Sequence, residues 1–398
     1  MAISGLAVTF PFMNLSAAFG AGVGVGSSSY LSVKLGQRDY STAQRILGNN
    51  ITLNIIIGFI FSVVSLIFLD PILYFFGASD QTIPYAREYM IIILLGNIIT
   101  HLYFGMNAVL RAASKPRQAM YTTIFTVVLN SILDPLFIYT FDMGIRGAAI
   151  ATILSQTVAR AWQIRLFSDK GELLHLKRGI YRLDNRIVKN ILGIGISPFA
   201  MNATACLVAI FVNQRLLEYG GDLAVGAFGI ANRVAFIFIM INFGVNQGMQ
   251  PIAGYNYGAQ NYDRLMRVLK LAMIAGTCVT TSGFIVAEFM PHLCVRLFTN
   301  DKVLTDLAVN GIRIMMAAMP IVGYQMIVTN FFQSIGKAKI SIFLSLSRQL
   351  IFLVPLLAIL PLFIGVNGVW VSLPIADAFS AIFALVMMVR YMRVFKKI

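Results

Sequence analysis

A carboxylate lies well inside an apolar stretch of this sequence, in "TVVLNSILDPLFI" (residues 126–138). Asn130 precedes Asp134 by four residues, so in a helix the two side chains share one face. Pro135 has no backbone N–H, which leaves the carbonyl of Ser131 without its helical partner. A carboxylate, an amide and a free carbonyl this close together form an oxygen-rich cluster that suits a proton or a sodium ion.

The cost of burying Asp134 is the reason to expect a function there. A carboxylate at the centre of a bilayer costs about 2.5–3.5 kcal/mol on insertion scales, and acids kept at such depth usually face a cavity or a partner. Two interpretations follow: Asp134 exchanges a coupling cation, or it only hydrogen-bonds a neighbouring helix. From the residues alone we prefer the first interpretation.

A second deep acid, Asp377, occurs in the last apolar stretch. Arg348 lies at a similar depth on the preceding, antiparallel stretch, counted back from the turn at 363–368. We expect a structural ion pair between Arg348 and Asp377, with a role in substrate binding as the alternative.

The stretch "GAGVGVGSSSYLSVKLGQRDY" (residues 20–40) looks at first like a glycine loop that holds a phosphate. Such loops follow a strand and open a helix. Here no strand pattern precedes the glycines, and there is no G-x-x-x-x-G-K-[ST]. Small residues at this spacing instead let helices approach closely in a bilayer, so nucleotide binding is excluded.

These residues need a membrane-spanning scaffold. Hydrophobic residues make up 58% of the chain and charged residues 12%, with a mean hydropathy of +0.79. Soluble domains carry about 25% charged residues, so a soluble domain is excluded. Apolar stretches of spanning length, about 20 residues, recur with short loops between them. We predict eleven helical spans, at residues 2–32, 44–69, 83–112, 117–141, 145–168, 186–217, 224–252, 262–290, 303–335, 337–362 and 366–394.

The basic residues gather on one side of these spans. When the spans are followed in order with alternating sides, most of the 31 Lys and Arg residues fall on one face, and the charged residues of the opposite face are mostly acids. By the positive-inside rule this basic face is cytoplasmic, together with the linker 169–185 and the C-terminus. The net charge of +15 then sets orientation and contacts anionic lipids, and it requires no nucleic acid partner.

The sequence repeats itself at a constant offset of 222 residues. The matching pairs are Gly22 and Gly244, Gly26 and Gly248, Gly36 and Gly258, Tyr40 and Tyr262, Arg45 and Arg267, and Lys115 and Lys337. Halves separated by an even number of spans have the same orientation. The repeat therefore predicts an all-α membrane protein of two pseudo-symmetric helical bundles, with the substrate path between them.

The repeat also sets the expected domains. Residues 1–168 form an N-terminal lobe of five spans, residues 169–185 form the linker, and residues 186–398 form a C-terminal lobe of six spans. The repeat partner of the span 186–217 would precede Met1. We therefore expect eleven of twelve transmembrane helices, with a first helix absent from this chain.

Five motifs together resemble the MATE (multidrug and toxic compound extrusion) family. They are "GVGVGSSSYLSVKLGQRDYSTA", "MNAVLRAASKP", "NSILDPLFI", "GGDLAVGAFGIANRV" and "GVNQGMQPIAGYNYGAQNYDRL". The resemblance covers essentially the whole chain, with residues 1–168 matching family helices 2–6 and residues 186–398 matching helices 7–12. It implies a two-lobed exporter in which a cation gradient drives the expulsion of amphipathic, often cationic, compounds.

The resemblance assigns a cation-coupling site in the first lobe to Asp134, Asn130, Asn107 and Thr152. We prefer a proton as the coupling ion because one titratable acid suffices, with Na⁺ at Asp134 and Asn130 as the alternative. No other metal and no cofactor are expected. A second sodium site of the family uses acids in the seventh and tenth helices. It has no counterpart here, because 198–214 and 314–335 contain no acid.

Methionine and phenylalanine are frequent, with 19 Met and 30 Phe residues. Those that face the substrate path would form a soft, adaptable surface for varied ligands. The candidates for this substrate cleft are Met13, Phe104, Met106, Phe236 and Met240.

These observations favour a secondary active multidrug exporter of the plasma membrane, which is no enzyme and need not form an obligate oligomer. The closest alternative is a lipid-linked oligosaccharide flippase of related architecture, which would need several cations to hold a pyrophosphate. A membrane enzyme would need His, Asp, Glu or Cys residues clustered at one depth, and an ATP-driven pump would need a soluble nucleotide-binding domain. A passive channel does not explain the buried Asn130 and Asp134.

Overall fold

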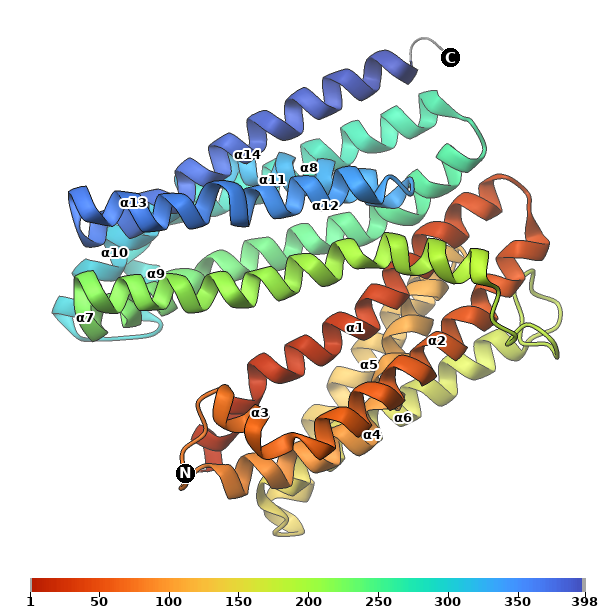
Figure 1. The fold of residues 1–398 in the computed structure, drawn as a ribbon, viewed down its shortest axis with the longest axis horizontal. Helices are drawn as coiled ribbons and strands as arrows, with labels where there is room; N and C mark the ends of the chain where they lie inside the picture. The colour runs from red at the N-terminus through yellow and green to blue at the C-terminus, as the bar shows by residue number, and fades with distance from the viewer. Residues whose placement is uncertain (1, 396–398) are drawn as a thin grey trace. The chain divides into compact units, whose positions relative to one another are not determined.

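The fold is seen in a computed structural model, which describes the backbone of residues 2–395 and the side chains of residue 6 and residues 9–392. The described part of the chain consists of helices and connecting loops (Figure 1). It divides into two compact units, Met1–Asn202 and Ala203–Ile398.

Unit 1 is built around one central helix, α4, which packs against α1, α2, α5 and α6. Its helices are α1 (Ala2–Gly36), α2 (Tyr40–Ile67), α3 (Leu69–Phe75), α4 (Ile83–Ala112), α5 (Pro116–Pro135) and α6 (Gly144–Ser168), with a π-helical segment, η1 (Leu136–Thr140), after α5. The first turns of the long helix α7 (Asn185–Gly258) complete this unit.

Small residues bring α1 close to the start of α7 inside unit 1. A methyl group on Gly26 would collide with the carbonyl oxygen of Ile191, and one on Gly195 would collide with that of Gly22. Backbones this close leave no room for a side chain. The interpretation of the glycine stretch as a helix-packing surface is confirmed at these positions. The same contacts explain why unit 1 extends to Asn202, whereas the sequence repeat begins its second half at residue 186.

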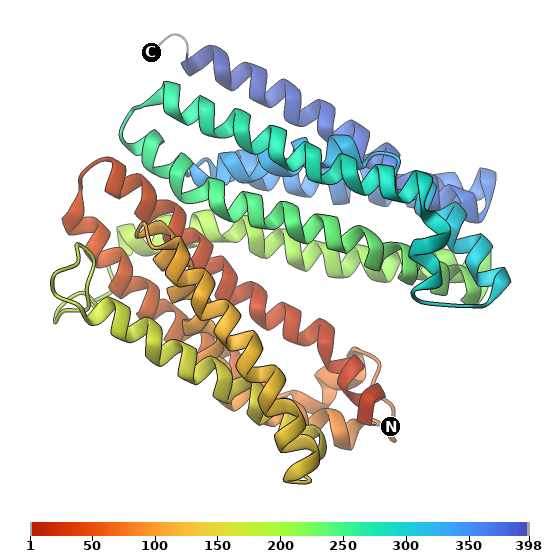
Figure 2. The same cartoon turned by 180° about the vertical axis from the view of Figure 1, so that it is seen from behind.

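Unit 2 contains the rest of α7 and the helices that follow it (Figure 2). These are α8 (Tyr262–Phe289), α9 (Pro291–Arg296), α10 (Lys302–Met316), α11 (Met319–Ser334), α12 (Ala338–Leu346), η2 (Ser347–Leu353, π-helical), α13 (Val354–Ile364) and α14 (Val366–Phe395). Two of the predicted spans, 186–217 and 224–252, lie in α7, which breaks at Gly221 with φ 67° and ψ −170°. Another, 303–335, is bent by 49° between α10 and α11.

Membrane-spanning helices dominate both units. Seven helices in the described part are long and apolar enough to cross a bilayer, and an eighth span forms if α10 and α11 count as one. Helix α6 and the glycine-rich α1 occupy two further predicted spans. The predicted all-α integral membrane fold is confirmed.

Candidate functional site

The site around Asp134 lies where α5 changes its winding. The α-helix ends at Pro135, and the π-helical segment η1 continues from Leu136. Proline cannot donate a helical hydrogen bond, and such wider turns are common where a helix carries a functional group. The local sequence therefore places Asp134 directly before an irregular turn.

Asn130 and Asp134 form the pair that their spacing predicts. The Nδ2 of Asn130 donates a hydrogen bond to the Oδ1 of Asp134 at 3.1 Å, and both residues are half-buried. The amide thereby holds one oxygen of the carboxylate in a fixed place on the face of α5.

Two more residues join this pair from neighbouring helices. Tyr89 of α4 is hydrogen-bonded to the side chain of Thr152 on α6, and it lies close enough to Asp134 to interact with its charge. Tyr89 is only 6% exposed. Thr152 also donates to the backbone carbonyl of Ala148 at 3.0 Å. Helices α4, α5 and α6 thus bring an acid, an amide and two hydroxyls together inside unit 1.

Asn107 does not belong to this group, which corrects the predicted four-residue site. Its Nδ2 donates to the carbonyl of Ala119 at 2.9 Å and to the hydroxyls of Thr122 and Thr123 at 3.1 Å, and Arg111 donates to its Oδ1. Ala119 precedes Asn130 by eleven residues of the same helix. That separation is about 16 Å along the helix axis. Asn107 therefore joins the opposite end of α5 to α4.

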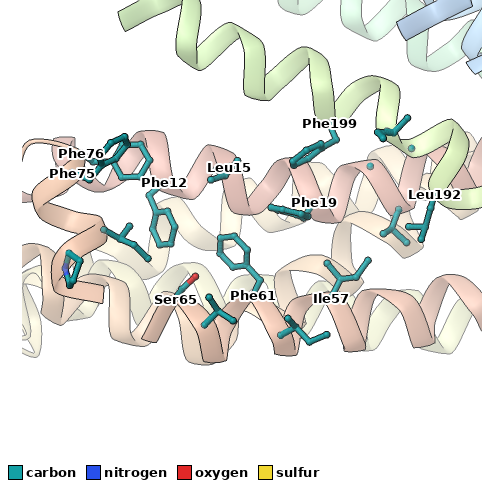
Figure 3. A pocket seen from close by; sticks show the side chains of 18 residues that line it. Phe12, Leu15, Phe19, Ile57, Phe61, Ser65, Phe75, Phe76, Leu192 and Phe199 are labelled. Atoms are coloured by element: carbon teal, nitrogen blue, oxygen red, sulfur yellow. The ribbon is translucent and has the colours of Figure 1, made fainter. Parts of the chain in front are cut away.

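Unit 1 also contains a large apolar cavity of about 890 Å³. Aromatic rings form much of its wall, among them Phe12 and Phe61, stacked at 5.5 Å, and Phe19 and Phe199, 4.6 Å apart between centroids (Figure 3). Ser65 contributes the one polar side chain among the described residues of the lining. Cavities of this size accept drug-sized ligands, and these walls suit flat apolar ones.

The five predicted cleft residues lie elsewhere. Met106 is 1% exposed and packs in the hydrophobic core, so the prediction that it faces a substrate path is corrected. Met13 is half-buried beside Phe12, outside the cavity lining. The other three are exposed helix side chains, namely Phe104 on α4 and Phe236 and Met240 on α7.

Unit 2 holds the deep ion pair that the sequence suggested. The Nε of Arg348 donates to the Oδ1 of Asp377 at 2.6 Å. Arg348 lies in the π-helical segment η2, and Asp377 on α14 is 8% exposed. The pair joins the span that contains η2 to the last helix of the unit. Such a contact matches a structural role because it satisfies both charges within the fold.

Comparison with known proteins decides the family. The sequence model of the MatE family matches residues 1–136 and 198–359, one segment in each half of the repeat. The chain belongs to the MatE family.

Similar proteins extend the match over nearly the whole chain. The multidrug export protein MepA of Staphylococcus haemolyticus is 28% identical over 383 residues, which cover 96% of this chain and 84% of that protein. The solved MATE multidrug transporter DinF-BH is 34% identical, with a TM-score of 0.90 over 99% of this chain and 88% of the other. An outward-facing multidrug resistance MATE transporter, 24% identical, shares the fold with a TM-score of 0.94 over 99% and 89% of the two chains.

Tyr89 is the site residue of this MatE chain that the sequence interpretation missed. Its signal is present in "YMIIILLG" (residues 89–96), where the tyrosine hydroxyl is the one side-chain polar group of an otherwise apolar run. A buried tyrosine hydroxyl usually has a hydrogen-bond partner. The sequence does not reveal that this partner is Thr152, because the contact depends on how α4 packs against α6.

Proposed function

We propose that this MatE member is a secondary active exporter that expels amphipathic, often cationic, compounds in exchange for protons, with Na⁺ as the alternative coupling ion. The observation that carries the proposal is the convergence of Asp134, Asn130, Thr152 and Tyr89 inside a membrane-spanning bundle. The names of the similar proteins, multidrug export protein and multidrug transporter, support the export of small molecules.

Asp134 is the group that exchanges the coupling ion. When it binds a proton or Na⁺ it loses its uncompensated charge, which changes its interactions with Asn130 and Tyr89. Because these partners lie on different turns and helices, the exchange alters how tightly α4, α5 and α6 hold together. This altered packing favours one of two orientations of the lobes, and alternating access follows.

The apolar cavity of unit 1 suits the proposed substrates. Flat aromatic cations bury their ring surface against Phe12, Phe19 and Phe61, and ring faces attract positive charge. Because the walls contain few directional polar groups, they do not select for one arrangement of hydrogen bonds. Such a surface accepts ligands of varied shape.

The flippase alternative is not favoured by this cavity. A lipid-linked pyrophosphate needs cationic side chains, and the described residues of the lining include none. The proposal therefore remains an exporter that acts in the plasma membrane, with the basic loops and the linker 169–185 on the cytoplasmic side.

The experiment is transport of ethidium, a fluorescent amphipathic cation, into proteoliposomes that contain the full chain. A pH step or a Na⁺ step is imposed across the membrane, and protein-free liposomes serve as the control. Uphill accumulation driven by the pH step, and abolished by a protonophore, is the expected result. Uphill accumulation under the Na⁺ step alone would assign sodium as the coupling ion. Movement of ethidium only down its own gradient would contradict the proposal.

A further inference from the structure

A second cavity, of about 450 Å³, lies where the loop before α7 packs against the start of α2. Its charged lining is entirely basic in the part of the chain that the structure describes, with Arg45 from α2 and Lys177 and Arg178 from the loop. Tyr40, Gln44, Leu173 and His175 also line it. This basic pocket lies in unit 1 and takes no part in the Asp134 site or the apolar cavity.

The walls of the basic pocket are held in place by hydrogen bonds between α2 and the loop. Gln44, which is 5% exposed, donates to the carbonyl of His175 and accepts from the backbone N–H of the same residue. Asn49 donates to the carbonyl of Arg182 at 3.2 Å and accepts from the N–H of Asp184 at 3.0 Å. These bonds fix the loop before any ligand arrives, so little ordering is needed on binding.

The positive charge of the basic pocket is largely uncompensated. Three carboxylates of the neighbouring segments already have cationic partners: Asp39 with Lys34 at 3.1 Å, Asp184 with Arg45 at 3.5 Å, and Glu172 with Lys115 at 2.8 Å. Lys177 and Arg178 are exposed, and the ion pairs of the described residues include neither. Lys177 and Arg178, next to Arg45, therefore favour an anion as the ligand of this pocket.

The rim of the basic pocket includes apolar surface and lies at the start of α2, a helix long and apolar enough to span a membrane. Leu173 is 55% exposed and Tyr40 47% exposed, and Tyr40 is the first residue of the spanning helix α2. A tyrosine at the end of a span lies at headgroup level. A free inorganic ion would make no favourable contact with this apolar rim. An anion that carries acyl chains uses both the cations and the rim.

We propose that the basic pocket binds the phosphate of an anionic phospholipid. Lys177 and Arg178 contact the phosphate oxygens, and Tyr40 and Leu173 contact the glycerol and the first part of the acyl chains. The bound lipid ties the loop before α7 to the membrane surface beside α2. This site is independent of the proposed export activity.

The test is native mass spectrometry of the full chain in detergent with phosphatidylglycerol, and with phosphatidylcholine as the zwitterionic comparison. The pocket variant is Lys177→Gln with Arg178→Gln. The matched control is Arg264→Gln with Arg267→Gln, which removes the same charge from exposed residues at the start of α8. A surface cation near anionic lipid contributes about 1 kcal/mol, or about fivefold in binding. The pocket variant is therefore expected to bind phosphatidylglycerol about 25-fold more weakly, if both cations contribute fully.

The outcomes separate a built site from general attraction. The control variant is expected to keep nearly full binding, and inorganic phosphate in excess over the lipid is expected to leave the lipid bound. Equal losses in the two variants would overturn the proposal, because they would show attraction to net charge alone. Displacement by inorganic phosphate, or equal binding of phosphatidylcholine, would overturn the assignment to an anionic lipid. The melting temperatures of both variants are measured as a check on folding. They are expected to match that of the parent because the replaced residues are exposed.

Discussion

The surroundings of Asp134 combine a contact within α5, to Asn130, with the neighbouring Tyr89 of α4. The sequence identifies the acid, the amide one turn earlier and the proline that follows, because these contacts are local to α5. It does not identify Tyr89, whose place beside Thr152 depends on the packing of α4 against α6. The sequence misplaces Asn107 for the same reason, because the partners of this side chain depend on how α4 packs against α5. Asn107 lies at the level of α4 that packs against Ala119 and Thr122, and these two residues are at the opposite end of α5 from Asp134.

The role of Tyr89 is tested by Tyr89→Phe, which removes only the hydroxyl. Losing one hydrogen bond of about 0.5–1.5 kcal/mol is expected to change the apparent affinity for the coupling ion about two- to tenfold. The measurement is the dependence of ethidium transport on pH or Na⁺ concentration. Tyr85→Phe is the control, because Tyr85 lies one turn earlier on α4 and is exposed. The same response in both variants would remove Tyr89 from the site.

Arg348 and Asp377 are expected to matter for stability. Arg348→Gln leaves the carboxylate of Asp377 buried without its cation. Breaking a buried pair costs about 3–5 kcal/mol, and partial exposure of Arg348 lowers the cost to about 3 kcal/mol or less. Thermal unfolding in detergent measures the loss.

The matched control for this pair is Glu88→Gln, which breaks the exposed pair of Arg146 with Glu88. Solvent-exposed ion pairs contribute little to stability, so this variant is expected to melt close to the parent. A melting temperature for Arg348→Gln as high as that of the control would show that the deep pair is not structural.

At the scale of elements, the positions of the helices follow from the sequence better than their breaks do. Each predicted span coincides with helical structure, because about 20 consecutive apolar residues in lipid must satisfy their own backbone hydrogen bonds. The break between α10 and α11 lies at residues 317–318, and Pro320 follows it in the first turn of α11, where a proline favours the start of a new helix. The short helices α3 and α9 were not foreseen, because they lie in loops where no periodic pattern extends far enough.

The repeat predicts equivalent glycines, and the structure distinguishes them. Gly26→Ala drives its methyl group against the carbonyl oxygen of Ile191, so a loss of about 1–3 kcal/mol is expected from overpacking. On its repeat partner Gly248, a methyl group would meet no atom within 4 Å beyond its own helix and chain neighbours. Gly248→Ala is therefore expected to gain up to about 1 kcal/mol of helix propensity. Thermal unfolding distinguishes the two variants. Equal melting temperatures would contradict the close approach of α1 and α7 at Gly26.

For the whole molecule, composition and repetition are sufficient to predict the class of protein. A charged content of 12% and an offset of 222 residues lead to a membrane protein built from two similar halves, and the MatE family match agrees. The large cavity of unit 1 was not predictable in the same way. Its lining joins Phe12 and Phe61 to Phe199, which are distant in sequence, and any of these rings could equally have faced lipid.

The central claim is that Asp134 couples export to an ion gradient, and Asp134→Asn tests it most directly. The variant keeps the size of the side chain and removes its charge. Asp142→Asn is the matched control, because Asp142 is an exposed acid beyond the end of η1 whose φ of 51° asparagine also adopts. The measurement is uphill ethidium accumulation in proteoliposomes under an imposed gradient of the coupling ion. We predict that Asp134→Asn abolishes accumulation while Asp142→Asn and the parent chain retain it. Full uphill accumulation by Asp134→Asn would contradict the claim.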